Sequence, residues 1–233
     1  MSEHRRSLTG ALPYLLLGPP YIFLAKEAAS KLNRNGLTYA SGYTNHVREH
    51  ISPFVEKAST IMEVGAGEAL WSLREAGVYE HVGSSADVTF LDPAPFSAVS
   101  KEEAIKHFNR TPSFITRAIS SDLSTPPPDL IISVFTLCSV SDLASSVRSI
   151  YDLLPPGSTY AFVEHVAAPK STPYRTMQKV LTPLQAKLAD NCHLDRETPR
   201  MIEEVFGNVE GHVVREEGMW PVAEVFYGSA VKR

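Results

Sequence analysis

The chain has 233 residues, of which 43% are hydrophobic and 21% are charged, which suits one globular domain with a three-layer core. The formal net charge is −4, so no basic field is present to recruit nucleic acid. Two cysteines, Cys138 and Cys192, are too few for a disulfide framework. We therefore expect a reducing, cytoplasmic location.

An apolar run near the N-terminus, residues 12–25, follows Arg5 and Arg6 as in a signal peptide. No small-residue cleavage site follows it, and three prolines interrupt it: Pro13, Pro19 and Pro20. The run is also too short and broken to span a bilayer. We expect residues 1–58 to form a helical lid that caps substrate over a domain of residues 59–233. A membrane-peripheral or oligomer contact through residues 12–25 stays open, in a monomer or homodimer.

The hydrophobic pattern predicts two helices first, over 20–33 and 47–57, the second interrupted near Pro53. Strands and helices then alternate, with strands at 60–64, 87–91, 113–119, 129–134 and 159–164 and helices at 69–76, 101–108 and 141–154. Two helices follow at 172–189 and 197–206, and strands at 209–214 and 222–231 are expected to end the sheet as an antiparallel pair. The alternation predicts an α/β fold with a doubly wound sheet. Ligands of such sheets bind at the carboxyl ends of the strands.

A glycine turn follows the first of these strands, and a carboxylate ends the second. Glu63 precedes the turn, Gly65, Ala66 and Gly67 form it, and Asp92 is the carboxylate. This pairing is how an open α/β sheet holds the ribose of a nucleoside cofactor, with glycine allowing close approach of the backbone. The alternative interpretation is an ordinary strand–turn–helix with a turn aspartate before Pro93.

The residues in the turn discriminate between two nucleoside cofactors. Leu70 stands where a dinucleotide fold has its third glycine, and Glu68 would face a pyrophosphate. Glu63, Gly65 and Gly67 instead match the Glu/Asp-x-Gly-x-Gly-x-Gly pattern of class I S-adenosylmethionine enzymes, with Ala69 replacing the last glycine. S-adenosylmethionine has no phosphate, so it tolerates an acidic neighbour.

Two later segments carry a family resemblance. Residues 129–140 (DLIISVFTLCSV) resemble the fourth strand of class I S-adenosylmethionine-dependent methyltransferases, and residues 153–168 (LLPPGSTYAFVEHVAA) resemble their fifth strand and its preceding turn. Residues 191–198 (NCHLDRET) are similar to a segment of the methyltransferase-like thiol methyltransferases and their microbial relatives. The resemblance runs from about residue 61 to 232, and Ser158 replaces a glycine of the family pattern. It implies a Rossmann-like class I fold and a thiol acceptor.

Other candidate ligands of the cofactor lie in the loops after the strands. Asp122 is a candidate for the adenine amino group, and Leu123 and Pro93 line the same loops. Phe135 and Thr136 stand at the mouth of the fourth strand, where backbone carbonyls hold the ammonium of the cofactor. Asp122 is otherwise a solvated turn aspartate.

His165 is the candidate catalytic residue, because it follows the fifth strand and histidine can accept a proton near neutral pH. His193 is a weaker candidate, and Tyr39, Tyr43 and both histidines are expected to contact substrate. Each of them is alternatively a structural residue, and both cysteines are interpreted as buried small hydrophobes. His46 and His50 resemble half of a metal site, but without a third ligand we predict no metal.

These residues predict an S-adenosylmethionine-dependent methyltransferase that acts on a small-molecule acceptor. We expect it to serve secondary metabolism. The acceptor is a thiol by family resemblance, with oxygen or nitrogen left open. The alternative is a methyltransferase-fold protein that transfers no methyl group and acts as another enzyme or an interaction subunit.

Overall fold

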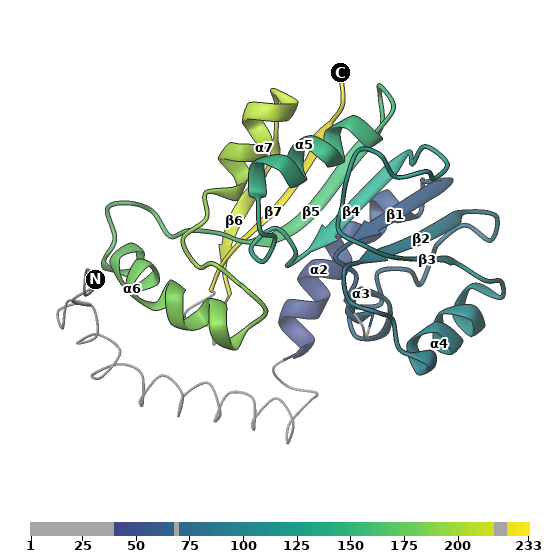
Figure 1. Ribbon diagram of the computed structural model, residues 1–233, viewed down its shortest axis with the longest axis horizontal. Helices are drawn as coiled ribbons and strands as arrows, with labels where there is room; N and C mark the ends of the chain where they lie inside the picture. Colours follow the sequence, from purple (N-terminus) through teal and green to yellow (C-terminus); the bar gives the residue numbers. More distant parts are fainter. Residues whose placement is uncertain (1–39, 68–69, 217–222) are drawn as a thin grey trace, which may run out of the picture.

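The computed structural model describes residues 40–67, 70–216 and 223–233. In this part of the chain, strands form one seven-stranded sheet in the order β3-β2-β1-β4-β5-β7-β6 (Figure 1). The strands are β1 (Thr60–Val64), β2 (Asp87–Asp92), β3 (Ser113–Thr116), β4 (Leu130–Val134), β5 (Thr159–His165), β6 (Glu210–Arg215) and β7 (Glu224–Val231). Only β7 runs antiparallel to its neighbours, β5 and β6. The predicted doubly wound sheet with a C-terminal antiparallel pair is confirmed.

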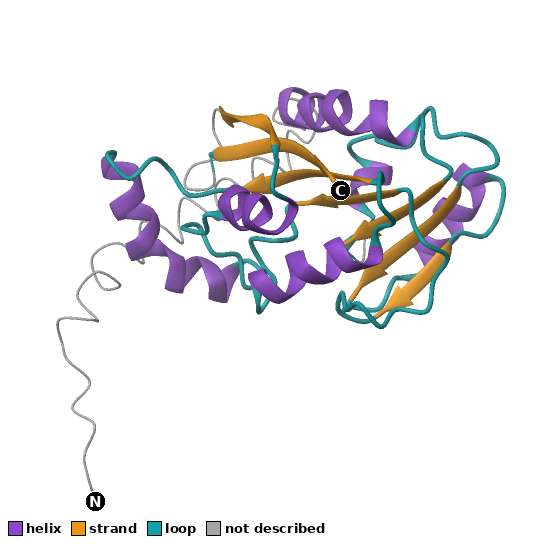
Figure 2. Cartoon of the chain, turned by 90° about the horizontal axis from the view of Figure 1, so that it is seen from above, coloured by secondary structure: helices purple, strands orange, loops and turns teal. Residues whose placement is uncertain are grey.

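Helices cover both faces of the sheet (Figure 2). They are α2 (Ala40–Val55), α3 (Trp71–Arg74), α4 (Ala98–Phe108), α5 (Leu143–Leu153), α6 (Pro173–Leu188) and α7 (Thr198–Phe206). Side chains of α2, α3 and α4 share one core with the sheet, and those of α5 and α7 share a second core on the opposite face. Burial of these apolar faces is what holds the three layers together.

The central strands of the sheet are buried on both faces. Leu130, Ile131 and Ile132 are each at most 2% exposed, although successive side chains point to opposite faces. The strand order reverses between β1 and β4, which pair directly in the middle of the sheet. A crevice opens outside the carboxyl ends of the strands at such a reversal, and this geometry predicts the place of a ligand.

Two sequence predictions of element bounds are wrong. The helix predicted over 47–57 is not interrupted near Pro53: α2 begins at Ala40 and runs through Pro53 to Val55, because Pro53 is exposed in the last turn while Ile51 and Val55 remain fully buried. The strand predicted over 113–119 ends at Thr116, since Thr116 pairs with Asp92, the last residue of β2.

The N-terminal region belongs partly to the sheet domain. Val47, Ile51 and Val55 of α2 are fully buried in the core beneath the sheet, so residues 47–55 of the predicted lid contribute to that core. Residues 1–39, with the predicted helix over 20–33 and the apolar run at 12–25, lie outside the described residues. Among the described helices, none combines the length and apolar character needed to cross a membrane.

Candidate active site

The glycine turn after β1 meets the turn after β4. Gly65 and Gly67 both have φ of +69°, a region where a side chain is strained. A Cβ on Gly65 would lie 2.2 Å from Cγ2 of Thr136, so only glycine fits there. The Oγ1 of Thr136 donates a hydrogen bond of 3.0 Å to the carbonyl of Val64. This close approach and hydrogen bond therefore join the turn after β1 to the turn after β4.

Asp92 joins the end of β2 to the glycine turn. Its carboxylate is 8% exposed, with Oδ2 accepting a hydrogen bond from the Gly67 N–H (2.8 Å) and Oδ1 accepting one from the Ala94 N–H (2.8 Å). A carboxylate oxygen can accept more than one hydrogen bond, so both oxygens keep capacity for ribose hydroxyls. Among the described residues, a Cβ on Gly67 would meet no atom within 4 Å, so this end of the turn borders open space. These features fit the nucleoside end of the predicted cofactor.

Glu63 lies in the core below the glycine turn, only 2% exposed. One carboxylate oxygen accepts a hydrogen bond from the Ser72 hydroxyl, and the other accepts one from the Tyr79 hydroxyl at 2.7 Å. Burial raises the pKa of Glu63 to about 7, against the two hydrogen bonds. Because both oxygens are engaged by the protein, the geometry favours support of the turn over direct contact with a ligand.

Glu164, near the end of β5, organises the turn after β4. Its carboxylate is fully buried and accepts hydrogen bonds from the N–H groups of Thr136 (3.2 Å) and Leu137 (2.9 Å) and from the Ser133 hydroxyl (2.8 Å). Burial raises the pKa of the Glu164 carboxyl, and these donors oppose the shift. Sequence reasoning missed this residue, whose signal is an acidic side chain within an otherwise apolar strand.

Phe135 occupies the tip of the same turn with φ of +54°, a left-handed conformation that is uncommon outside glycine. Its ring stacks on the imidazole of His165, with 4.4 Å between the ring centroids. The stacking places the end of β5 beside the turn after β4, so the predicted cofactor residues and the predicted catalytic histidine adjoin.

The loop after β3 holds Asp122 at the surface, where its carboxylate accepts hydrogen bonds from the Ser120 hydroxyl and from Arg117 (3.0 Å). The Ser120 hydrogen bond and the Arg117 charge hold the pKa of Asp122 below its ordinary value. Leu123 is buried in the core under α5, and Pro93 is exposed beside Asp92.

His165 lies between the only two cysteines of the chain. Its Nδ1 is 3.7 Å from the Cys138 sulfur and 3.9 Å from the Cys192 sulfur. Its Nε2 is buried, with no hydrogen-bond partner among the described residues. The cysteines are buried as predicted, but sequence reasoning missed that their sulfurs meet this histidine.

The two thiols differ in acidity. The neighbouring Cys138 thiol lowers the pKa of Cys192, and Gln185 and Arg196 act in the same direction against burial. The same interaction raises the pKa of Cys138, and burial adds to the effect. Cys192 is therefore the thiol that ionises first.

Backbone contacts fix the loop that carries Cys192. The N–H of His193 donates to the carbonyl of Cys138 (2.8 Å), and the Asn191 side chain donates to the carbonyl of Ser139 (2.8 Å). Arg196 adds two hydrogen bonds, to the carbonyls of Leu137 and Val140. The loop between α6 and α7 is thereby tied to the turn after β4.

His193 itself is half-exposed on this loop, and its Nε2 lies 3.3 Å from Oδ1 of Asn191. Burial lowers its pKa, and the charge of Arg196 adds to that. Tyr39 and the side chain of Tyr43 lie outside the described residues. The structure brings His165 and His193 to the same edge of the sheet, on neighbouring segments.

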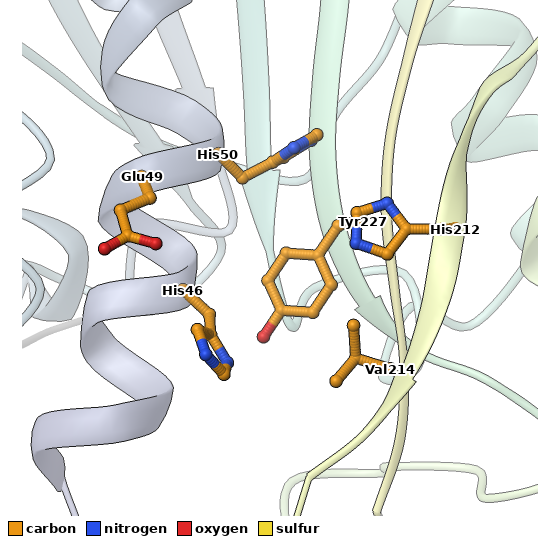
Figure 3. A pocket seen from close by; sticks show the side chains of 6 residues that line it. All are labelled: His46, Glu49, His50, His212, Val214 and Tyr227. Carbon is orange, nitrogen blue, oxygen red and sulfur yellow. The ribbon is translucent and has the colours of Figure 1, made fainter.

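A cavity of about 380 Å³ lies between α2 and the strands β6 and β7, away from the glycine turn. Figure 3 shows His46 and His50 reaching from α2 toward Tyr227, with His212 on the opposite side. Nδ1 of His46 is 3.0 Å from the Glu216 carboxylate, and Nε2 of His50 donates to the carbonyl of Gly228 (3.1 Å). Among the described residues, neither histidine belongs to a group of three potential metal ligands.

The strand order, the reversed last strand and the glycine turn after β1 are those of the class I S-adenosylmethionine-dependent methyltransferase fold. An N-methyltransferase NodS from Bradyrhizobium japonicum, solved with S-adenosyl-l-homocysteine, superposes with a TM-score of 0.56 over 91% of this chain and 97% of its own, at 14% identity. A Burkholderia thailandensis 1,6-didemethyltoxoflavin-N1-methyltransferase, also solved with S-adenosylhomocysteine, superposes with a TM-score of 0.57. The match covers 91% of this chain and 89% of that protein, at 11% identity. The [4+2]-cyclase SpnF superposes with a TM-score of 0.56 over 81% of this chain and 80% of its own, at 12% identity.

Sequence similarity points to one group of methyltransferases. The chain is 27% identical to thiol S-methyltransferase TMT1B of Rattus norvegicus over 74% of this chain and 70% of that protein. It is 33% identical to thiol S-methyltransferase TMT1A of Homo sapiens over 45% of this chain and 43% of that protein. No protein-family model matches the chain. The resemblance to class I methyltransferases, and to their thiol-methylating branch, is confirmed.

Proposed function

We propose that this chain is an S-adenosylmethionine-dependent methyltransferase that methylates the sulfur of a small-molecule thiol. The observation that carries the proposal is the contact of Asp92 with the glycine turn at the reversal of the strand order, opposite Thr136. Similarity to proteins named thiol S-methyltransferases supports sulfur as the acceptor atom.

The residues proposed to hold the cofactor surround this crevice. Asp92 accepts the ribose hydroxyls, the backbone of the glycine turn lies against the nucleoside, and Phe135 and Thr136 border the methionine end. Gly65, Ala66, Gly67, Pro93, Asp122 and Leu123 complete the proposed contacts. The cofactor supplies a methyl group on a sulfonium ion, whose charge is lost as the methyl leaves. The contribution of the protein is to orient the acceptor in line and exclude water.

On the acceptor side, His165 and His193 are the proposed contacts, with Tyr39 and Tyr43 as further candidates. Nδ1 of His165 faces two sulfurs, so Nε2 is the nitrogen left to meet a ligand. His165 is thus a candidate general base for an acceptor that is protonated at working pH.

Calorimetry with S-adenosylhomocysteine tests the cofactor assignment. Asp92→Ala removes two hydrogen bonds to a charged group, worth about 1.5–3 kcal/mol each, so the dissociation constant should rise about 10²–10⁴-fold. Asp87→Ala, at the exposed opposite end of β2, is the matched control and should bind like the wild type. Absence of binding by the wild type, or equal binding by Asp92→Ala, rejects the assignment.

A second candidate function is a methyltransferase-fold protein that transfers no methyl group. Glu68 and Ala69 depart from the methyltransferase pattern, although both lie outside the described residues, and a [4+2]-cyclase shares the fold. Incubation with methyl-labelled cofactor and a panel of thiols, phenols and amines separates the two. Catalytic formation of a labelled thioether supports the first function, and labelled cofactor left unreacted across the panel supports the second.

A further inference from the structure

Cys138, His165 and Cys192 form the one group of potential metal ligands found in residues 40–67, 70–216 and 223–233. They come from three separate segments: the turn after β4, the last residue of β5 and the loop between α6 and α7. Thiolate is a soft donor and imidazole a borderline one, and this combination favours zinc over hard cations such as magnesium or calcium.

The distances fit a tetrahedral ion. Zinc lies about 2.3 Å from sulfur and 2.0–2.1 Å from nitrogen, so a tetrahedral angle separates a sulfur ligand from a nitrogen ligand by about 3.6 Å. The observed separations are 3.7 and 3.9 Å from Nδ1 of His165 to the two sulfurs. These two distances need contract by only a few tenths of an ångström, and the two sulfurs lie within 4.8 Å of each other, against about 3.8 Å in a tetrahedral site.

The surroundings fit a held site as well. Cys138 is 1% exposed and Cys192 is 6% exposed. The loop of Cys192 is fastened to the turn of Cys138 by the His193 N–H and by the guanidinium of Arg196. Such outer contacts orient ligands and hold a metal site together.

We propose that Cys138, His165 and Cys192 bind a zinc ion whose fourth ligand is the thiolate of the acceptor. Three protein ligands and an open position are the arrangement of catalytic rather than structural zinc. The buried Nε2 of His165 carries the ring proton when Nδ1 binds the metal, and this N–H has no described protein acceptor. In the proposed complex, the bound acceptor molecule accepts the hydrogen bond from this N–H.

The second half of this proposal rests on the proposed function. Zinc binding releases the proton of the acceptor thiol to solvent and keeps its sulfur as a thiolate at neutral pH. The sulfur then forms a bond to the methyl carbon, and the bond from that carbon to the sulfonium breaks. The electron pair of the broken bond stays on the departing sulfur. Zinc undergoes no redox change, and no further reactant is needed.

Cobalt(II) titration of the full chain tests the site without catalysis. The protein is stripped of metal and reduced with a phosphine. One equivalent of cobalt should give intense sulfur-to-cobalt absorption and tetrahedral bands, and one equivalent of zinc should remove them. Cys192→Ser should weaken binding at least about a hundredfold, beyond the usual effect of outer contacts. His81→Gln, which changes an exposed histidine, should bind like the wild type.

Folding and the rival site are controlled in the same experiment. Circular dichroism and S-adenosylhomocysteine calorimetry establish that each variant is folded, and His165→Asn provides a second ligand variant. His50→Ala tests the histidine cavity beside α2. Absence of sulfur-to-cobalt absorption in the reduced wild type, or its persistence in folded Cys192→Ser, overturns the zinc site, as does loss in His50→Ala alone.

Ethanethiol tests the open position, with ethanol as its matched control. Ethanethiol, but not ethanol, should shift the cobalt spectrum in the absence of any methyl donor. An unchanged spectrum rejects the acceptor as fourth ligand. Thiol methylation at an equal rate by metal-free protein rejects the catalytic role but leaves the proposed function standing. Metal binding without S-adenosylhomocysteine binding leaves the zinc site standing and rejects the proposed function.

Discussion

The two halves of the proposed active site are built differently. The cofactor half uses two neighbouring strands and their turns, with Asp92 reaching Gly67 across 25 residues of chain. The acceptor half joins three segments, each 27 residues from the next, and the last of them comes from a loop between helices. One half follows from the geometry of the sheet, and the other depends on how a loop docks on it.

This difference predicts that damage to the two halves is separable. A change in the acceptor half should affect turnover with the fold and cofactor affinity preserved. A change in the cofactor half should affect affinity and stability together, because the glycine turn is packed between β1, β2 and the turn after β4.

His165→Ala gives the largest expected effect. Turnover should fall about 10²–10⁴-fold while S-adenosylhomocysteine affinity stays nearly unchanged, because the residue acts mainly in the transition state. Steady-state kinetics and calorimetry measure the two quantities, and His81→Ala is the control. Wild-type turnover in folded His165→Ala would contradict any role for this residue in the reaction.

Raising the pH separates two roles of His165. If it is a general base, the variant should recover part of its activity as the acceptor thiol, with a pKa of about 8.5, ionises unaided. If it is a zinc ligand, the variant should have lost cobalt binding as well.

Glu63 tests the cofactor half through stability. Its folded pKa of about 7 exceeds the ordinary value of 4.5, so the folded state binds the extra proton between these values. Its contribution is therefore fully present below pH 4.5 and is lost as pH rises to about 7, by about 3 kcal/mol. Glu63→Gln should unfold in urea with a smaller loss of stability from pH 5 to 8 than the wild type. Parallel pH profiles of the two proteins would refute the shift.

Gly65 and Gly67 form a matched pair. Both have φ of +69°, so alanine at either is strained by about 1–2 kcal/mol. Only Gly65→Ala also collides with Thr136, which should lower the free energy of unfolding by a further 1–3 kcal/mol or so. Urea unfolding of the two variants gives the difference. Equal stability of the two variants would mean that the contact with Thr136 is soft.

Asp122→Ala should have the smallest effect. The carboxylate is exposed and already engaged by Ser120 and Arg117, so a single hydrogen bond to adenine is at stake. Affinity for S-adenosylhomocysteine should fall about three- to tenfold, as expected for one such bond. A loss of affinity as large as that of Asp92→Ala would contradict this minor role and make Asp122 a principal ligand of the cofactor.

The proximity of the residues in the cofactor half could be predicted from the sequence, but the meeting of Cys192 with the other two residues of the acceptor half could not. Gly65, Gly67 and Asp92 occupy fixed places in a strand–turn–helix pattern, so their proximity follows from the pairing of β1 with β2. Cys138, His165 and Cys192 meet only after the loop after α6 folds back, which no local period encodes. Glu63 was predicted as a ligand because a motif gives its position but not the direction of its side chain.

The buried carboxylate of Glu164 has a consequence for both halves. It holds the N–H groups of Thr136, on the cofactor side, and of Leu137, next to Cys138. Ordering this turn costs conformational entropy. If one ligand orders the turn from one side, the other ligand loses less entropy on binding, and the two bind with positive cooperativity. Linkage makes the effect reciprocal: the factor by which a cofactor analogue tightens thiol or metal binding equals the factor by which they tighten the analogue.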